Sequence, residues 1–400
     1  MHPPIKPLFI IVLGLLTAFG SISIDMYLPA FIHISQDYNV SIDAVQLSLS
    51  AFFIGFSLGQ LFYGPITDRF GRKNPLYFGI ILYIIASIGC ILSPTINALI
   101  FFRFLQALGG CSGVIISRAM VRDCFTENHA ARVFSLLMLV MGAAPILAPL
   151  AGGMIAEVLN WRWIFGVTTC FGVICLCLTF FLLDETLPVE RRTVQLNLKA
   201  TLHNYKAVLR DRSFIGYAIS GSLCSGGLFA YVAGSPFVVI NLYGVPPDRY
   251  GWFFGANAFG LIATSQANSW LLARYSFDRI LKSGYLFISA CAFYLLLAVW
   301  FGFSLWLYAA GLFFYIGIMG IIGPNYNAGA LGNQANRAGS AAALLGTFQF
   351  LSATLSSSLV SFFHNGTSMP MTLIMIGCVT SSLIVYFVTS PYKHRKEVHP

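Results

Sequence analysis

The chain has 400 residues, of which 57% are hydrophobic and only 9% are charged, and its formal net charge at pH 7 is +9. Soluble proteins carry about 25% charged residues, so this composition excludes a water-soluble fold and predicts an integral membrane protein. The positive charge does not indicate nucleic-acid binding, because most basic residues lie in short loops between apolar segments, where they report topology. The nine cysteines form no CxxC pair and no Cys/His spacing, so we interpret them as packing residues and expect no metal site.

Apolar segments of about 20 residues match the ~30 Å hydrocarbon core of a bilayer. Twelve such segments are predicted to be spanning helices, at residues 8–32, 44–66, 75–93, 97–119, 131–156, 162–183, 213–240, 250–273, 280–301, 304–323, 339–363 and 369–389. Six spans on either side of one long polar segment is the layout of secondary transporters built from two bundles. We therefore predict an all-α membrane fold with six-helix bundles at 1–183 and at 213–400, the second ending in a short basic tail.

The distribution of lysine and arginine predicts the orientation of these spans. If the N-terminus is inside, only Arg162 and Arg249 fall outside, while Arg103 and Arg118 lie in or at the edge of the fourth span. Positive residues favour the cytoplasmic side, and an even number of spans returns the chain to the side where it began. We therefore expect both termini in the cytoplasm of a bacterium and the protein in its inner membrane.

The first span carries a single acid, Asp25, within the segment SISIDMYLPAF at 21–31. A carboxylate at the centre of a membrane helix costs about 2.5–3.5 kcal/mol on insertion scales, so such a residue usually faces a polar cavity or a partner. Burial favours the protonated form of a carboxyl group, which makes Asp25 a candidate proton-binding residue. The alternative is a capping role at the end of the span, where Tyr27 and Pro29 suit a helix that nears the membrane surface.

The loop after the second span reads GPITDRFGRK at 64–73. Gly64 would allow another helix to approach closely, and Asp68 could accept hydrogen bonds at a helix end. Ordinary topology charge does not explain the spacing of Gly64, Asp68, Arg69, Gly71, Arg72 and Lys73. This spacing resembles the signature loop of the major facilitator superfamily. The resemblance implies that the loop is a cytoplasmic gate, which latches the inner side in the outward-facing state.

The fourth span begins with RFLQALGG at 103–110. An arginine several residues inside a span needs an anion, water or the membrane edge. The spacing resembles the R-x-x-Q-x-x-G motif of the same superfamily, whose arginine is implicated in proton coupling. We expect Arg103 to face a central cavity and to sense the charge on Asp25; snorkelling to the outer interface is the alternative.

The fourth span ends with a second cluster of charge. Arg118 and Arg122 lie four residues apart on one helical face, next to Asp123. They predict an inner charge network with Asp68 and Arg69, or else a plain interfacial cluster.

The fifth span contains GAAPILAPLAGG at 142–153. Its two prolines each remove a helical hydrogen bond and are expected to bend the helix, and its small residues allow close packing. Generic packing in a membrane helix is the alternative interpretation. The ending resembles the antiporter motif of the superfamily, which is associated with exporters, although Ala148 stands where that motif commonly has glycine. The residues of this motif are Gly142, Pro145, Pro149, Gly152 and Gly153.

The longest polar segment, 184–212, is predicted to be a cytoplasmic linker. Leu198, Leu202, Tyr205 and Leu209 recur in it at helical spacing, which predicts an amphipathic helix on the inner membrane surface. We interpret the segment both as a tether that lets the two halves move and as a solvated linker that carries topology charges.

Further segments resemble the bicyclomycin-resistance (Bcr/CflA) branch of drug:proton antiporters. They are DMYLPAF at 25–31, RAMVRD at 118–123, DETL at 184–187, YVAGSPF at 231–237 and AGSAAALLG at 338–346. In this chain Thr17 stands where some related antiporters have a second acid in the first span. The resemblance implies proton-coupled efflux of small amphipathic compounds by alternating access. Four residues are guesses for the wall of an aromatic substrate cavity: Tyr27, Phe229, Tyr231 and Asn257.

Two other functions remain open from the sequence. One is export of a native metabolite, such as a siderophore or an amino acid, and the other is a transporter-like sensor without turnover. An enzyme is not expected, because no catalytic constellation and no Walker loop occurs. We expect a monomer in the lipid bilayer that binds protons and a small-molecule substrate, requires no cofactor, and is driven by the proton gradient.

Overall fold

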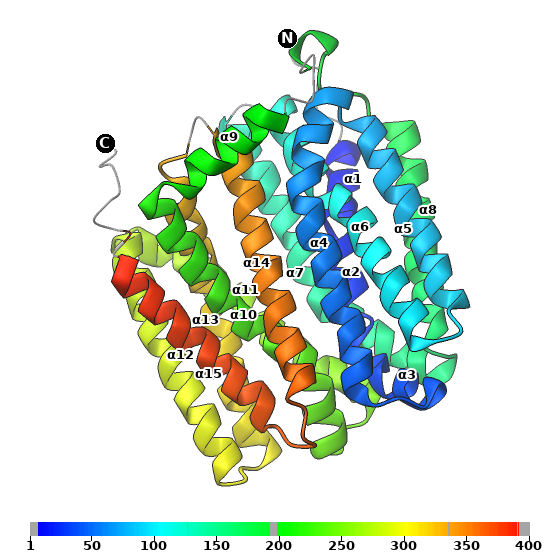
Figure 1. The fold of residues 1–400 in the computed structure, drawn as a ribbon, viewed down its shortest axis with the longest axis vertical. Coiled ribbons are helices and arrows are strands. Elements are labelled where there is room, and N and C mark those ends of the chain that lie inside the picture. Colours follow the sequence, from blue (N-terminus) through cyan, green and yellow to red (C-terminus); the bar gives the residue numbers. More distant parts are fainter. Residues whose placement is uncertain (1–6, 126, 193–197, 335–336, 390, 392–400) are drawn as a thin grey trace. The chain divides into compact units, whose positions relative to one another are not determined.

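The computed structural model describes residues 7–125, 127–192, 198–334, 337–389 and 391, and in this part of the chain every regular element is helical (Figure 1). The all-α prediction is therefore confirmed. The chain divides into two compact units, Met1–Asn197 and Leu198–Pro400. We call them unit 1 and unit 2.

Unit 1 begins with a span that is broken rather than continuous. Its elements are α1 (Pro7–Thr17), α2 (Phe19–Asp25), the short turn η1 (Leu28–Ala30), α3 (Phe31–Tyr38), α4 (Ile42–Phe70), α5 (Lys73–Leu92), α6 (Ile96–Cys124), α7 (Glu127–Val158), α8 (Arg162–Leu182) and the turn η2 (Val189–Arg191). The chain bends by 41° between α1 and the helical stretch that follows it. At the break, Thr17 Oγ1 donates a hydrogen bond to the carbonyl of Gly14 at 2.7 Å, a side-chain contact that often bends helices.

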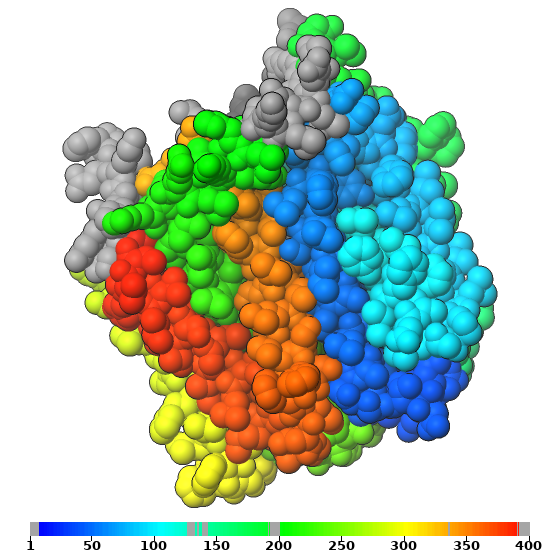
Figure 2. Space-filling model, in the orientation of Figure 1, coloured from blue at the N-terminus to red at the C-terminus, as the bar shows by residue number. Residues whose placement is uncertain are grey.

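Unit 2 begins with the amphipathic helix that the sequence predicts in the linker. Its elements are α9 (Leu198–Leu209), α10 (Arg212–Pro236), the π-helical turn η3 (Phe237–Leu242), α11 (Pro247–Leu272), α12 (Phe277–Trp300), α13 (Leu305–Leu331), α14 (Ala338–Phe362) and α15 (Met369–Thr389). Figure 2 shows α14 and α15 side by side on one face of this unit, and α9 packs against α10 and α14. The turn predicted between the ninth and tenth spans is present, with Gly302 at φ +63°.

The helices are those of a multi-pass membrane protein. Within the described residues, nine helices are long and apolar enough to cross a membrane, and the bent pair at the start makes a tenth. The other two predicted spans, 131–156 and 250–273, coincide with α7 and α11. In α7 the apolar stretch whose side chains are described is Ala143–Val158. Each of the twelve predicted spans thus has its helix or helix pair.

In unit 1, α4 and α6 pack with their backbones almost in contact. A Cβ atom at Gly55 would overlap the carbonyl oxygen of Phe104 and lie 3.1 Å from the Cβ of Ala107. One turn further along α4, a Cβ at Gly59 would lie 2.8 Å from the Cβ of Cys111. Small residues permit this approach in membrane helices. The pair carries both groups of predicted functional residues, Arg103 near one end of α6 and Asp123 at the other.

Candidate functional site

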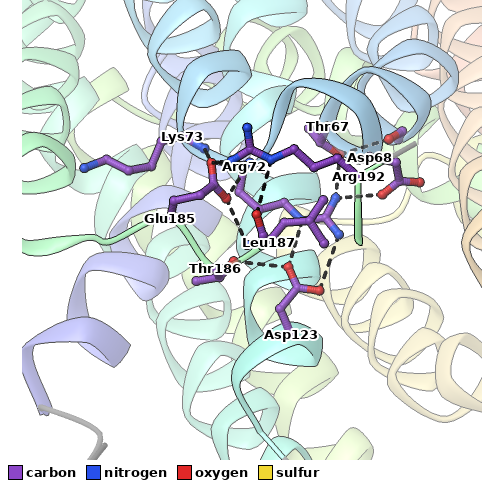
Figure 3. Close-up of polar contacts among 10 residues, drawn as sticks. Thr67, Asp68, Arg72, Lys73, Asp123, Glu185, Thr186, Leu187 and Arg192 are labelled. Carbon is purple, nitrogen blue, oxygen red and sulfur yellow. Dashed lines mark hydrogen bonds and ion pairs between the residues drawn. The ribbon is translucent and has the colours of Figure 1, made fainter. Parts of the chain in front are cut away.

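The loop between α4 and α5 is built around Arg72. Gly71 turns the chain between the two helices with φ +81°, a conformation that favours glycine. Arg72 is only 7% exposed, and its guanidinium contacts polar groups in unit 1 (Figure 3). We call this cluster the Arg72 network; it consists of Thr67, Asp68, Arg72, Lys73, Asp123, Glu185, Thr186, Leu187 and Arg192.

Two carboxylates hold the Arg72 side chain. Its Nε donates to Asp123 Oδ2 at 2.8 Å and its Nη2 to Asp123 Oδ1 at 3.3 Å, a bidentate pair. Its Nη1 donates to Asp68 Oδ1 at 2.8 Å and to Thr67 Oγ1 at 2.9 Å. Burial alone would lower the pKa of Arg72, but the two carboxylates outweigh burial and raise it above its ordinary value. The network therefore contains a permanent positive charge that joins α4 to α6.

The chain that follows α8 completes the network through Glu185. Its carboxylate accepts hydrogen bonds from the backbone N–H groups of Arg72, at 2.9 and 3.0 Å, and of Lys73, at 3.2 Å. It also lies 3.4 Å from Arg192 Nη2. Burial raises the pKa of Glu185, but the amide groups and Arg192 outweigh it and hold the pKa below its ordinary value. Glu185 is a residue that the sequence analysis did not select, and its only signal was the segment DETL.

The side chains of the other basic residues predicted for this site lie outside the network. Arg69 stacks over Phe70 at 4.9 Å. Lys73 joins the network through its backbone N–H alone, and its side chain extends over Tyr77 at 5.6 Å. Arg118 and Arg122 are exposed and make no ion pair with a described residue.

Gly64 also differs from its prediction. A Cβ there would meet nothing within 4 Å, so the close helix approach expected at Gly64 is not present in this structure. The predicted charge network therefore contains Asp68 and Asp123, joined by Arg72 rather than by Arg69, Arg118 or Arg122.

Asp25 and Arg103 both lie inside unit 1 but do not pair. Asp25 ends α2 and is 6% exposed, while Arg103 in α6 is 0% exposed. Among the described ion pairs and hydrogen bonds, none involves the Asp25 carboxylate. Arg103 is thus fully enclosed in this structure rather than exposed at a cavity surface.

Aromatic rings take the place of an anion around Arg103. Its guanidinium carbon lies 4.4 Å from the ring centres of both Tyr27 and Phe52 and 5.7 Å from that of Phe165. Its Nη1 donates to Gln106 Oε1 at 2.6 Å, whereas Nε and Nη2 have no hydrogen-bond partner. Cation–π contacts of this kind are worth about 2 kcal/mol or more where both groups are desolvated. The guanidinium is therefore held chiefly by stacking.

The antiporter motif on α7 lies directly against the turn that carries Asp25. A Cβ at Gly152 would overlap the carbonyl oxygen of Met26 and lie 2.7 Å from its carbonyl carbon, so α7 and this turn touch backbone to backbone. Helix α7 continues through Pro145 and Pro149, and Gly153 is buried. Gly142 belongs to a part of α7 whose side-chain surroundings lie outside the description. The contact between Gly152 and Met26 was not foreseen from the sequence.

Two of the four residues proposed for a substrate cavity line one pocket of unit 2. Asn257 Nδ2 donates to Tyr231 Oη at 2.8 Å. Both residues border a cavity of about 220 Å³ with mostly aromatic walls, which include Tyr250 and Trp306. Phe229 instead packs against a neighbouring phenylalanine of α14, and Tyr27 is enclosed in unit 1 beside Arg103. The lining in unit 2 combines mostly aromatic side chains with the amide of Asn257 and the tyrosines Tyr231, Tyr250 and Tyr308.

Comparison with known proteins assigns the chain to a family. The model of the Major Facilitator Superfamily matches residues 13–357. The chain is 35% identical over 384 residues to the uncharacterized MFS-type transporter YdgK of Bacillus subtilis, with 94% of each chain covered. It is 33% identical over 384 residues to the bicyclomycin resistance protein homolog of Haemophilus influenzae, with 96% of each covered.

A solved structure supports the same fold. The crystal structure of a D-xylose–proton symporter superposes with a TM-score of 0.74 and covers 97% of this chain and 98% of its own, at 16% identity. At that identity the likeness concerns the fold alone. Because the family model and both relatives extend over most of the sequence, the chain belongs to the Major Facilitator Superfamily and is a multi-pass membrane transporter.

Proposed function

We propose that this chain exports small amphipathic compounds or drugs across the bacterial inner membrane in exchange for protons. The observation that carries the proposal is the carboxyl group of Asp25, which is buried in unit 1 without an ion-pair or hydrogen-bond partner among the described residues. The next residue, Met26, touches the antiporter motif of α7 at Gly152. A relative with 33% identity bears the name bicyclomycin resistance protein homolog, which supports export of drug-like compounds.

Asp25 would couple transport to the proton. An ionised carboxylate with no partner is costly in apolar surroundings, so the enclosed state of this turn requires a proton on Asp25. A conformation that opens the turn to water removes this cost and allows release of the proton. The substrate and the proton would compete for the open state, and one charge that crosses 100 mV supplies about 2.3 kcal/mol. The proton gradient is then sufficient as the energy source, without a cofactor.

The Arg72 network would serve as the cytoplasmic gate of an alternating-access cycle. It joins α4, α5 and α6 through charge-assisted hydrogen bonds that can form and break as a group. This assignment requires both termini in the cytoplasm, as the distribution of basic residues predicts. The two bundles at 1–183 and 213–400, connected by the linker at 184–212, would move against each other in a monomer.

The aromatic pocket of unit 2 would contribute to substrate recognition. Its walls suit a flat apolar ring system. Tyr231 and Asn257, which are hydrogen-bonded to each other at 2.8 Å, would offer the substrate a polar contact. A pocket of this composition binds by area and stacking more than by a defined hydrogen-bond pattern. We therefore expect several amphipathic compounds to be transported rather than one.

The proposal is tested in proteoliposomes with an imposed pH gradient and a panel of labelled compounds that includes amphipathic drugs, siderophores and amino acids. Wild type should accumulate drugs only with the gradient. Asp25→Asn should lose gradient-driven transport but retain exchange of the same compound at equal pH, which shows that the variant is folded. The control is Asp248→Asn, an exposed acid at the start of α11, which should behave as wild type. Gradient-driven transport by Asp25→Asn at the wild-type rate would exclude Asp25 as the coupling residue.

A further inference from the structure

The chain that leaves α8 returns to the α4–α5 loop and completes the first turn of α5. Glu185 accepts hydrogen bonds from the backbone N–H groups of Arg72 and Lys73. These N–H groups lie at the start of α5, where backbone amides have no hydrogen-bond partner within the helix. A negative charge at this position is favoured by the helix dipole. Glu185 supplies this negative charge, although it lies 113 residues away in the sequence. Its side chain is 27% exposed.

Gly71 provides the space for this contact. A Cβ at that position would overlap Glu185 Oε2 and lie 2.8 Å from Arg192 Nη2. The residue that turns the chain between α4 and α5 is therefore also the surface on which the start of the linker rests. A larger residue at this position would displace the ends of the Glu185 and Arg192 side chains from their present places.

Further contacts fasten the linker start to the same cluster. Thr186 Oγ1 donates to Asp123 Oδ2 at 3.1 Å, the carboxylate that also holds Arg72 (Figure 3). Leu187 closes the segment, because its N–H donates to Glu185 Oε1 at 3.0 Å and its carbonyl accepts from Arg192 Nε at 3.3 Å. Arg72 and the linker therefore share both Asp123 and Glu185.

We propose that Glu185 is a positioning residue of the gate: it fastens the start of the linker to the α4–α5 loop, so that closure of the loop depends on where the linker is held. The inference rests on the proposed function of the Arg72 network. It adds a third component, contributed by the linker, to a gate that the sequence placed in the loop and in α6.

The other end of the linker belongs to unit 2, so the attachment at Glu185 connects the gate loop to that unit. Helix α9 starts at Leu198 and belongs to unit 2, where it packs against α10 and α14. The six residue steps from Arg192 to Leu198 span at most about 22 Å when fully extended. A displacement of unit 2 that exceeds this reach pulls on Glu185 and exposes the amides of α5, which releases Arg72 from its partners.

The attachment is tested by trypsin cleavage at Arg192 in inside-out membrane vesicles. Glu185→Gln removes the charge and weakens the hold on the linker, so cleavage should become roughly tenfold faster, the factor that corresponds to about 1.4 kcal/mol. The matched control is Asp184→Asn, the neighbouring exposed acid, which makes no hydrogen bond or ion pair with another described residue. Equal cleavage rates in wild type and both variants would overturn the proposal.

A kinetic measurement separates a gate from a merely structural contact. If Glu185 stabilises the closed gate, its loss increases the fraction of molecules open to the cytoplasm, and the apparent affinity for substrate added on that side rises in proportion to that fraction. Both KM and Vmax should therefore fall in Glu185→Gln. A fall in Vmax at unchanged KM would mean fewer folded molecules and would contradict the gate role. If wild type shows no gradient-driven transport of any compound, the proposed function fails, while the cleavage rates still decide whether Glu185 holds the linker.

Discussion

Replacement of Gly152 by alanine tests whether α7 holds the turn that carries Asp25. The new methyl group would overlap the carbonyl oxygen of Met26 and lie 2.7 Å from its carbonyl carbon and 2.8 Å from its Cα. Real Cβ atoms essentially never come within 3.0 Å of such neighbours. All three atoms belong to the backbone, so no side-chain rotation relieves the overlap, and either α7 or the Asp25 turn must move.

The size of the effect follows from two opposing terms. Overpacking of this kind costs about 1–3 kcal/mol, and alanine recovers about 1 kcal/mol relative to glycine in a helix interior. The free energy of unfolding should therefore fall by no more than about 2 kcal/mol. The displaced turn no longer encloses Asp25 as before, and an increase of about 1.4 kcal/mol in the transport barrier corresponds to a tenfold lower rate. The rate of gradient-driven transport should thus fall by a larger factor than the loss of folded protein alone would cause.

The assay compares gradient-driven transport in proteoliposomes with thermal unfolding in detergent. The matched control is Gly377→Ala on α15, where a Cβ would meet nothing within 4 Å. The same chemical change there should leave transport near wild type and raise the free energy of unfolding by up to about 1 kcal/mol. If Gly152→Ala transports at the rate of Gly377→Ala, α7 does not hold the Asp25 turn. Loss of transport and stability to the same degree would also refute the argument, because it would report general unfolding.

Two further predictions concern buried polar groups. Arg103→Lys keeps the charge but loses the planar group that stacks on the rings of Tyr27 and Phe52. The free energy of unfolding, measured by thermal unfolding in detergent, should therefore fall by about 1–3 kcal/mol. An unchanged unfolding midpoint would show that stacking contributes little. Asn325 Nδ2 donates to Asn268 Oδ1 at 2.7 Å between α13 and α11, so Asn325→Leu should cost about 1–3 kcal/mol by leaving the other amide without its partner. The double variant with Asn268→Leu should cost less than the sum of the single variants, and strict additivity would contradict a direct pair.

The loop of the Arg72 network shows how far a local pattern predicts a site. The spacing of Asp68, Gly71 and Arg72 placed all three in one gate loop. The ion pair between Asp68 and Arg72, four residues apart at a helix end, is what the structure adds. Asp123 was included because it follows a second basic run at the end of a span. Glu185 could not be placed in this way, since its contact to Arg72 crosses 113 residues and no spacing rule connects them. Long-range contacts of this kind require the fold.

Arg103 shows a different limit of sequence reasoning. The rule that a buried arginine needs an anion led to Asp25, because Asp25 is the one acid of the first span. The structure satisfies the guanidinium with the faces of Tyr27 and Phe52 instead. Aromatic residues make up 15% of the chain, so nothing in the sequence distinguishes the rings that enclose Arg103 from those that face lipid.

The separation of Arg103 from Asp25 changes how a proton on Asp25 would affect the gate. Without an ion pair between them, any contribution of Arg103 to the proposed coupling would pass through the helix that carries it rather than through direct attraction. Helix α6 also carries Asp123, twenty residues or about 30 Å further along, and α4 carries both Phe52 and Asp68. The tight contact of Gly55 with the backbone of α6 makes these two helices tilt together. A shift of the Asp25 turn against Tyr27 and Arg103 would then reach the Arg72 network as a rigid movement of the α4–α6 pair, which the linker at Glu185 either permits or resists.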